Sequence, residues 1–370
     1  MLHIVPGKPI GTLTVSAYMR ESIENMPGHD IVVVGASAGG VETLATLVST
    51  LPPKLPAAIF VVLHISAHSP SFVSDILSRS GLLEAVQASD GMEIKHGRIY
   101  VAPPDHHMLV ERGNVRVVRG PKENRHRPAV DPLFRSAALA YGPRVVGVIL
   151  TGVLDDGTAG LRAVKRCGGI AIVQDPDEAI YPGMPRSALE HVQVDHILPL
   201  AAIGPLLVRL ASEPVKEEAG DAMSEDLEKE TQKAEMDTTL MRADKQDGTP
   251  SVFSCPECGG VLWEIPDGNM PRFRCRVGHA FSTESMFAEQ SEALETALWV
   301  AMKTLEENAD LSRRMMQQAH MRGQKRLASR YEAKLREAEQ RIALIKRALI
   351  KSETNAEDER PATEQHLDKA

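Results

Sequence analysis

Residues 31–51, IVVVGASAGGVETLATLVSTL, hold the feature that decides the fold. An uninterrupted apolar run ends in a tight Gly-Ala-Ser-Ala-Gly-Gly turn, and the apolar residues that follow recur with helical spacing. A second uninterrupted run, AAIFVVLHI at 57–65, predicts another strand. Strands that are apolar at every position are buried on both faces, which is typical of a parallel sheet covered by helices. The stretch therefore predicts a doubly wound α/β domain.

The same pattern continues along the chain to about residue 211. Further buried strands and helices are expected, in order, at 143–152 (strand), 157–169 (helix), 169–174 (strand) and 199–211 (helix). Residues 92–120 differ, because short runs separated by turn residues predict antiparallel strands or hairpins added to the sheet. We expect one α/β domain with a mostly parallel sheet over residues 30–211, preceded by an N-terminal tail at 1–29.

Composition and charge narrow the possible functions. The chain has 370 residues, of which 43% are hydrophobic and 25% charged, so two or three globular units are expected. Its net charge of −8 provides no general basic surface, which argues against a nucleic-acid partner. No apolar run is long enough to span a bilayer, and the N-terminal segment lacks the apolar core of a signal peptide. We expect a cytoplasmic protein without membrane insertion.

Three of the four cysteines lie in one short segment. Cys255 and Cys258 are separated by two residues and followed by glycines, and Cys275 and His279 stand four positions apart. Three thiolates and one imidazole complete the tetrahedral ligand set of a structural zinc ion, with no open position for catalysis. The alternative is a group of reduced cysteines beside a surface histidine. We predict a zinc-binding, zinc-ribbon-like module at 251–283.

Charged and heptad-patterned segments flank this module. Residues 212–250 are rich in Glu, Asp and Lys, so a charged linker is expected. After the module, apolar residues keep a heptad spacing on either side of Gly323, and these residues are Leu294, Leu298, Ala301 and Leu305, then Tyr331, Leu335, Ala338, Ile342, Ile345 and Leu349. This spacing predicts a helical hairpin or coiled coil at 284–352, which could cap the zinc module, form a homodimer or dock on a partner. A polar tail is expected at 353–370.

Ser37, inside the glycine turn, has two possible roles. A dinucleotide-binding turn needs Gly-x-Gly-x-x-Gly and an acidic residue at the end of the second strand. Here the glycines stand at 35, 39 and 40, and the second strand ends in His64. Gly-x-Ser-x-Gly is also the turn that holds the nucleophile of a serine hydrolase. The histidine favours the hydrolase.

A serine, a histidine and a carboxylate can meet at the carboxyl ends of the predicted strands. Ser37 follows the first strand, His64 ends the second, and Asp155 and Asp156 follow the strand at 143–152. Sites of open parallel sheets form at this edge, where a carboxylate could hold the imidazole in its useful tautomer. Each residue alone has an ordinary structural explanation, such as helix capping by either aspartate. Together they favour a catalytic site, in a chain order unlike that of the α/β-hydrolases.

Six segments of this domain point to a family. They are GASAGGVE at 35–42, VVLHI at 61–65, IYVAPPDHHM at 99–108, HRPAVDPLF at 126–134, ILTGVLDDGTAGL at 149–161 and YPGMPRSAL at 181–189. Together they resemble the catalytic domain of the chemotaxis protein-glutamate methylesterases, the CheB family, over about residues 30–210. The resemblance implies hydrolysis of glutamate methyl esters on the cytoplasmic helices of chemoreceptors and deamidation of receptor glutamines, with no cofactor for catalysis.

The resemblance also implies roles for particular residues. Ser37 is the expected nucleophile, His64 the general base and Asp156 the orienting carboxylate. The backbone N–H groups of Ala38 and Val153 are the expected oxyanion hole, which stabilises the tetrahedral intermediate. Ester and amide substrates would pass through the same acyl-enzyme, so one site could serve both reactions.

Other parts of the sequence leave the function less closely defined. Met184 and Arg186 are expected at the rim of the site, or simply in a rigid loop with a solvated arginine. After the strand that corresponds to 143–152, the family usually has Thr-Gly-Met-Gly-x-Asp-Gly. In this chain Leu154 stands in place of the second glycine. Members are commonly fused to an N-terminal phosphoacceptor receiver domain, which residues 1–29 are too short to form. Two other functions stay open: a non-enzymatic signalling or docking protein on a degenerate scaffold, and a hydrolase of a different ester.

Overall fold

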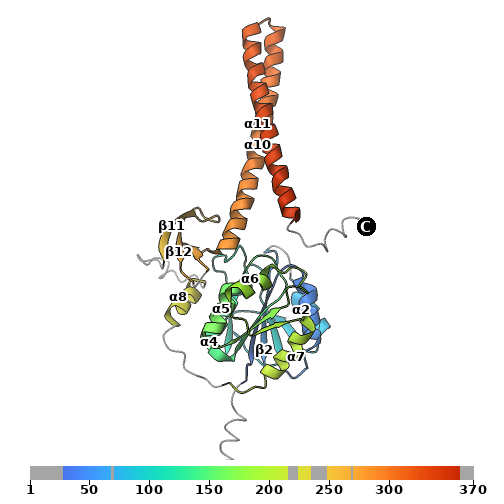
Figure 1. Ribbon diagram of the computed structural model, residues 1–370, viewed down its shortest axis with the longest axis vertical. Coiled ribbons are helices and arrows are strands. Elements are labelled where there is room, and N and C mark those ends of the chain that lie inside the picture. The colour runs from blue at the N-terminus through green and yellow to red at the C-terminus, as the bar shows by residue number, and fades with distance from the viewer. Residues whose placement is uncertain (1–27, 68–70, 216–223, 235–247, 268–269, 359–370) are drawn as a thin grey trace, which may run out of the picture. The chain divides into compact units, whose positions relative to one another are not determined.

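The computed structural model describes residues 28–67, 71–215, 224–234, 248–267 and 270–358 (Figure 1). Two compact units divide the chain after Ser285. Among the described residues, no helix is both long enough and apolar enough to cross a membrane. Almost all of the tail expected at 1–29 and most of the one expected at 353–370 lie outside the described residues.

The first unit is built on a parallel sheet of seven strands, in the order β10-β9-β8-β1-β2-β5-β3. The strands are β1 (Ile31–Ala36), β2 (Ala58–Leu63), β3 (Glu84–Gln87), β5 (Arg98–Val101), β8 (Val145–Ile149), β9 (Ile170–Gln174) and β10 (His196–Leu198). All neighbouring pairs run parallel. Strand β1 lies between β2 and β8, so the segments that follow these three strands emerge side by side. The doubly wound fold predicted from the sequence is confirmed.

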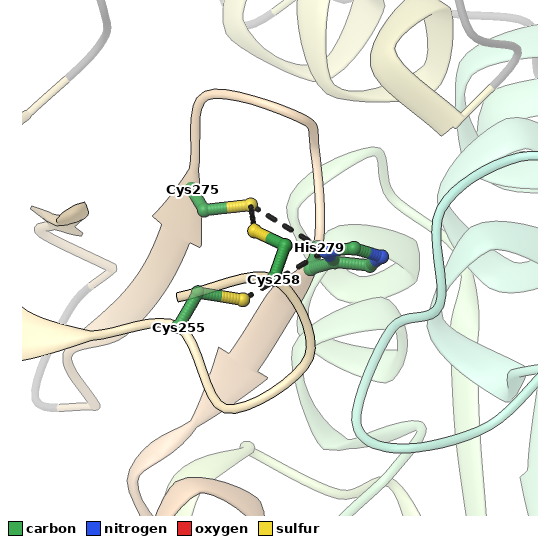
Figure 2. Close-up of side chains that lie close together, drawn as sticks. All are labelled: Cys255, Cys258, Cys275 and His279. Carbon is green, nitrogen blue, oxygen red and sulfur yellow. Dashed lines mark hydrogen bonds between the residues drawn. The ribbon is translucent and has the colours of Figure 1, made fainter. Parts of the chain in front are cut away.

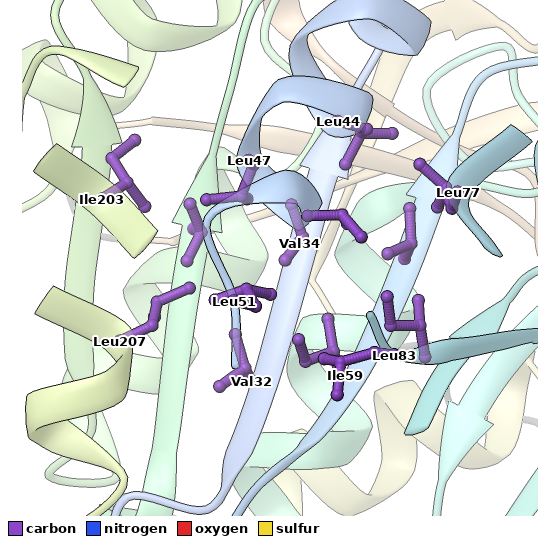
Figure 3. Packing of buried hydrophobic residues seen from close by; sticks show 14 of the residues in the cluster. Val32, Val34, Leu44, Leu47, Leu51, Ile59, Leu77, Leu83, Ile203 and Leu207 are labelled. Carbon is purple, nitrogen blue, oxygen red and sulfur yellow. The ribbon is translucent and has the colours of Figure 1, made fainter. Parts of the chain in front are cut away.

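Helices cover both faces of the sheet. One face carries α2 (Gly40–Ser49), α3 (Val73–Ser80) and α7 (Leu200–Leu210), and the other carries α4 (Val130–Tyr141), α5 (Thr158–Arg166) and α6 (Gly183–His191) (Figure 1). Alternate residues of β1 serve the two cores: Val32 and Val34 pack with Leu44 and Leu47 of α2 (Figure 3), and Val33 packs on the opposite face. Burial on both faces explains why the strands are apolar at every position.

The region at 92–120 differs in part from the antiparallel strands predicted there. A small antiparallel sheet does form, from β4 (Met92–Glu93), β6 (His107–Val110) and β7 (Asn114–Val118). Residues 98–101, however, form β5, which pairs in parallel with both β2 and β3 in the main sheet. The burial of Ile99, Tyr100 and Val101 is that of a central strand and not of an added hairpin. A short 3-10 helix, Gly142–Arg144, leads into β8.

The segment at 212–250 is more than a linker. Within it, α8 (Ser224–Ala234) packs against α4. The Glu230 carboxylate lies 3.3 Å from Nε of Arg135 and 3.0 Å from Nη1 of Arg272. Burial opposes ionisation of Glu230, but these two guanidinium groups lower its pKa to about 2. A polar sequence can therefore be docked by buried ion pairs, which hydrophobic periodicity does not reveal.

The cysteine segment forms a separate four-stranded antiparallel sheet in the same unit. Its strands, in spatial and chain order, are β11 (Thr249–Ser254), β12 (Val261–Ile265), β13 (Arg272–Cys275) and β14 (Ala280–Ser282). We call this sheet and its connecting loops, residues 249–282, the ribbon. Figure 1 shows the ribbon strands in yellow to orange beside α8.

The second unit is a hairpin of two long antiparallel helices. Helix α10 (Thr283–Met321) and helix α11 (Lys325–Asp358) meet at Gly323, whose φ of 67° suits glycine. The stripe predicted on α11 is buried or half-buried at all six positions. On α10 the prediction is wrong at Ala301 and Leu294, which are exposed, whereas Met302 and Ala309 are buried. The heptad on α10 runs through Leu298, Met302, Leu305, Ala309, Ser312, Met316 and Ala319.

Candidate active site and metal site

Ser37 lies in the turn between β1 and α2. The turn is tight because Gly39 takes a left-handed conformation, with φ of 69°, and caps the helix that starts at Gly40. The Ser37 N–H donates to the Thr151 carbonyl at 2.9 Å, and the Thr151 hydroxyl donates to the Ala38 carbonyl at 3.0 Å. The turn is thereby fixed to the end of β8, with the half-buried Ser37 side chain at the sheet edge.

His64 stands directly after β2 and bridges the serine to a carboxylate. Its Nδ1 is 3.1 Å from Oγ of Ser37, and its Nε2 is 2.7 Å from Oδ2 of Asp156. With the proton on Nε2 donated to Asp156, Nδ1 is free to accept the Ser37 hydroxyl proton. The structure thus brings Ser37, His64 and Asp156 into one chain of hydrogen bonds, the geometry that a nucleophile, base and orienting carboxylate require.

Asp156 is held ionised by several donors. It accepts hydrogen bonds from the Val130 N–H at 2.6 Å, from Nδ2 of Asn124 at 2.9 Å and from the Asp131 N–H at 3.3 Å, besides the bond from His64. Val130 and Asp131 open α4, and the amino end of a helix favours a negative charge. Burial opposes ionisation, but the bond from His64 and the other donors hold the pKa of Asp156 below its usual range.

The neighbouring Asp155 is in a different environment. It points to the ribbon, where its Oδ1 accepts a hydrogen bond of 2.7 Å from the Ser282 hydroxyl. Burial and nearby carboxylates raise its pKa to about 7, against the opposing effect of the Ser282 bond. The positions of the strand ends left Asp155 and Asp156 as alternatives, and the family resemblance favoured Asp156. Among the described contacts, only Asp156 bonds to His64.

Two further residues, which the sequence did not single out, contact the site. The Asn124 amide donates to Asp156 and also to Oδ2 of Asp131, at 2.8 Å. The His126 ring stacks on the His64 ring, with centroids 3.6 Å apart and planes 11° from parallel. Burial, and then the His64 charge, lower the pKa of His126, which leaves it neutral at ordinary pH. His126 begins a segment that carries the family resemblance, whereas no sequence pattern marks Asn124.

The expected oxyanion donors lie on loops beside Ser37. Within the part of the chain that the structure describes, the backbone N–H groups of Ala38 and Val153 donate no hydrogen bond. Val153 is 46% exposed, and the next residue, Leu154, has a φ of 60°. Leu154 therefore takes the left-handed conformation that the family's glycine would adopt without strain.

The two expected rim residues occupy different environments. Met184 is fully buried, and a Cβ on Gly152 would lie 2.1 Å from its sulfur and 2.9 Å from Cβ of Ser37. Met184 thus packs beneath the Gly152 loop and supports it. Arg186, two residues further on, is exposed. The catalytic, oxyanion and rim roles of all these residues remain predictions.

The ribbon brings together Cys255, Cys258, Cys275 and His279 (Figure 2). The four ligand atoms lie within 4.8 Å of one another. Nδ1 of His279 is 3.7 Å from Sγ of Cys255 and 3.6 Å from Sγ of Cys275, and the sulfurs of Cys258 and Cys275 are 3.7 Å apart. Zinc–sulfur bonds of about 2.3 Å in a tetrahedron give sulfur–sulfur edges of about 3.8 Å. The cluster therefore fits a tetrahedral metal ion.

A strand-to-helix serine turn, an imidazole and a buried carboxylate at the edge of a doubly wound sheet form the arrangement of a serine hydrolase. Comparison with known proteins agrees. A sequence model described as CheB methylesterase matches residues 32–207. A protein of Leptospira interrogans serogroup Icterohaemorrhagiae serovar copenhageni, named putative protein-glutamate methylesterase/protein-glutamine glutaminase, is 40% identical over 183 residues, which are 49% of this chain and 95% of that protein. The chain belongs to the CheB methylesterase family.

A longer relative and a solved structure also match about half of this chain. Protein-glutamate methylesterase/protein-glutamine glutaminase 4 of Anaeromyxobacter dehalogenans is 40% identical over 192 residues, which are 50% of this chain and 52% of that protein. The crystal structure of the Thermotoga maritima CheB methylesterase catalytic domain is 37% identical, covers 49% of this chain and 98% of its own, and aligns with a TM-score of 0.46.

Proposed function

We propose that this protein hydrolyses methyl esters of glutamate side chains on the cytoplasmic helices of chemoreceptors, and that it deamidates receptor glutamines at the same site. The observation that carries the proposal is the chain of hydrogen bonds from Ser37 through His64 to Asp156. The names of the family's members supply the class of substrate. The proposed compartment is the cytoplasm, where receptor helices are accessible and the cysteines stay reduced.

The proposed reaction has two halves. Nδ1 of His64 takes the proton of the Ser37 hydroxyl as Oγ attacks the ester carbonyl, and Asp156 stabilises the imidazolium that forms. The N–H groups of Ala38 and Val153 hold the oxyanion. Collapse breaks the carbon–oxygen bond, and methanol leaves with the proton from His64. Water, deprotonated by His64, then attacks the glutamyl ester of Ser37. The Ser37 oxygen leaves and takes that proton from His64, which frees the receptor's glutamate side chain.

An amide substrate follows the same course with a different leaving group. The imidazolium of His64 protonates the amide nitrogen, so ammonia leaves in place of methanol, and the acyl-enzyme is identical. No step needs a cofactor. A single site with one nucleophile can therefore serve both activities.

The competing function is a docking protein in which the α/β domain is a degenerate scaffold. A degenerate site would have no reason to keep Asp156 in a network of four donors, one of which is His64. A second alternative, hydrolysis of another ester, uses the same three residues, and the substrate assay decides it. The heptad residues of the helical hairpin pack between its own two helices, so a receptor or a second copy of this chain would dock on its exposed apolar residues, such as Leu294 and Leu344.

The test uses two forms of chemoreceptor cytoplasmic fragment, one methylated and one carrying glutamine at the modification sites. We expect methanol release from the first and ammonia release, with a gain of about 1 Da per site, from the second. Release from neither fragment, by a protein that still reacts with a general serine-hydrolase probe, would assign the site to a different ester. No reaction with the probe would favour the docking protein.

We further propose that the Cys255, Cys258, Cys275 and His279 cluster holds a structural zinc ion. All four coordination positions are filled by protein ligands, so the ion would contribute to folding and not to bond cleavage. Purified protein should contain about one zinc per chain, and Cys258→Ser should lose it. Cys167→Ser, at the cysteine outside the ribbon, is the matched control and should retain the metal; retention by Cys258→Ser would refute these ligands.

A further inference from the structure

The ribbon and the catalytic carboxylate meet at one short turn, residues 122–126, which we call the relay turn. Asn124 and Arg125 have φ of 47° and 73°, and Glu123 and His126 exchange two backbone hydrogen bonds of 3.2 and 2.9 Å. These features define a two-residue turn with both central residues left-handed, a conformation that asparagine tolerates well. The turn delivers Asn124 to Asp156 and His126 to the His64 ring.

The last strand of the ribbon, β14, is hydrogen-bonded to the relay turn. The Asn124 N–H donates to the Ala280 carbonyl at 2.8 Å, and the Ala280 N–H donates to the Lys122 carbonyl at 3.2 Å, so the turn extends the ribbon sheet by one bridge. The Asn124 side-chain oxygen accepts the Ser282 N–H at 2.9 Å and the Ser285 hydroxyl at 3.3 Å. With its oxygen on the ribbon, the amide nitrogen of Asn124 is directed at Asp156.

A buried ion pair also connects the ribbon to the relay turn. Both Glu123 carboxylate oxygens lie 2.8 Å from Nη2 of Arg135, on α4, and Oε1 lies 3.3 Å from Nη1 of Arg274, on β13 of the ribbon. The side chains of all three residues are at least 95% buried. Burial opposes ionisation of Glu123, but the two guanidinium groups hold its pKa far below the usual range. The Glu123 carboxylate therefore links α4 of the α/β domain to β13 of the ribbon.

We propose that the ribbon is a positioning element for the hydrolase: metal binding at its cysteines fixes β14, β14 and Ser285 fix Asn124, and Asn124 fixes Asp156 against His64. Metal loss then slows acylation of Ser37 without removing any residue of the triad. The inference rests on the proposed function for its chemistry, because it assumes that Ser37 is the nucleophile. Asn124 is a positioning residue in this scheme, since it contacts Asp156 and not the substrate.

The magnitude follows from geometry. Small displacements of a catalytic group can slow a reaction by about 100-fold, so we expect acylation to slow by about 10- to 100-fold when the grip on Asn124 is lost. The effect should fall on the rate of bond formation and leave ligand affinity nearly unchanged, because no residue of the ribbon or the relay turn is proposed to bind the substrate.

The experiment measures covalent labelling of Ser37 by a fluorophosphonate, which needs only the nucleophile and its base and is independent of the natural ester. The maximal labelling rate and the half-saturating probe concentration are compared in wild-type protein, in protein stripped of metal by a chelator under reducing conditions, and in Asn124→Gly. Glycine keeps the left-handed turn and removes only the side chain. The matched control is Glu264→Gln, on β12 of the ribbon, whose exposed carboxylate has no side-chain partner among the described residues.

We expect the maximal rate to fall by about 10- to 100-fold in both metal-free protein and Asn124→Gly, with the half-saturating concentration little changed and Glu264→Gln within about twofold of wild type. Removing the metal from Asn124→Gly should add little, because both changes break the same chain of contacts. Full labelling rates without metal, or losses that multiply, would overturn the proposal. A wild-type protein that is not labelled at Ser37 would instead refute the proposed nucleophile.

A second readout is independent of activity. Amide hydrogen exchange of the Val130 N–H, which bonds to Asp156, should quicken on metal loss while β1 stays protected. If β1 loses protection as well, metal loss has loosened the whole domain. The variant Arg274→Gln/Ser285→Ala then tests the positioning role separately. It keeps all four metal ligands and removes two side-chain contacts to the relay turn. A wild-type labelling rate in that variant would overturn the proposal.

Discussion

Replacing Asp156 by asparagine separates the carboxylate's charge from its shape. The amide is the same size, but it carries two N–H groups where Asp156 accepts bonds from His64, Val130, Asn124 and Asp131. Whichever way the amide is turned, an N–H group meets another donor. If the amide oxygen faces His64, the amide nitrogen lies against the Asn124 amide, and two donors meet. If the amide nitrogen faces His64, the imidazole must carry its proton on Nδ1, where it can no longer accept the Ser37 hydroxyl proton.

Two magnitudes follow from this geometry. Loss of the orienting carboxylate should lower kcat by about 10⁴-fold, or about 5.5 kcal/mol in the activation free energy. The opposed donors should lower the free energy of unfolding by about 1–3 kcal/mol. Methanol release from methylated receptor fragment gives the first value, and urea unfolding monitored by circular dichroism gives the second.

The neighbouring aspartate supplies the control. Asp155→Asn replaces a carboxyl whose pKa is about 7 and which bonds to Ser282 alone among the described side chains, so kcat should stay within about threefold of wild type. An Asp156→Asn protein that keeps more than about a tenth of the activity would refute the role of this carboxylate. Equal losses in the two variants would refute the assignment of position 156 over 155.

Three other predictions follow from single features of the structure. Folding raises the pKa of Asp155 from its ordinary value of 3.8 to about 7, so the unfolded chain ionises first and the free energy of unfolding should fall by up to about 4 kcal/mol as the pH rises from about 4 to 7. Asp155→Asn should reduce the fall by that amount, as urea unfolding at several pH values will show, and leave the part due to Asp131, whose pKa burial also raises to about 7; an unchanged fall would place its origin elsewhere. Leu154→Gly should raise the free energy of unfolding by up to about 1 kcal/mol by relieving the left-handed backbone at φ 60°, and a decrease would contradict that strain. Leu335→Ala, at a buried position of the helical hairpin, should destabilise the hairpin by about 2–3 kcal/mol in thermal unfolding and leave Ser37 labelling unchanged, whereas slower labelling would show that the hairpin acts on the site.

The sequence was sufficient for the features that depend on local pattern. The apolar runs at 31–35 and 57–65 predict buried parallel strands, and the ends of such strands predict where Ser37 and His64 emerge. The heptad on α11 identified its buried face at every position. On α10, Ala301 fits the heptad spacing, but Met302 is buried in its place. Alanine occurs on buried and exposed helix faces alike, so the residue type at 301 does not indicate the face.

The features that were missed depend on contacts between distant parts of the chain. Asn124 acquires its function from β14, about 160 positions later, and no local pattern records that pairing. Helix α8 is docked by Glu230 against two arginines, a charge arrangement that looks like a solvated face in sequence. Strand β5 reads as part of a hairpin region until its parallel partners are known.

Comparison of wild-type protein with Ser37→Ala on methylated chemoreceptor fragment tests the central claim most directly. Ser37→Ala removes the hydroxyl that forms the acyl-enzyme and leaves the turn, the His64–Asp156 pair and the ribbon intact. We predict steady methanol release by wild type and a rate lower by about 10⁴-fold or more in Ser37→Ala. Equal release by the two proteins would remove Ser37 from the mechanism.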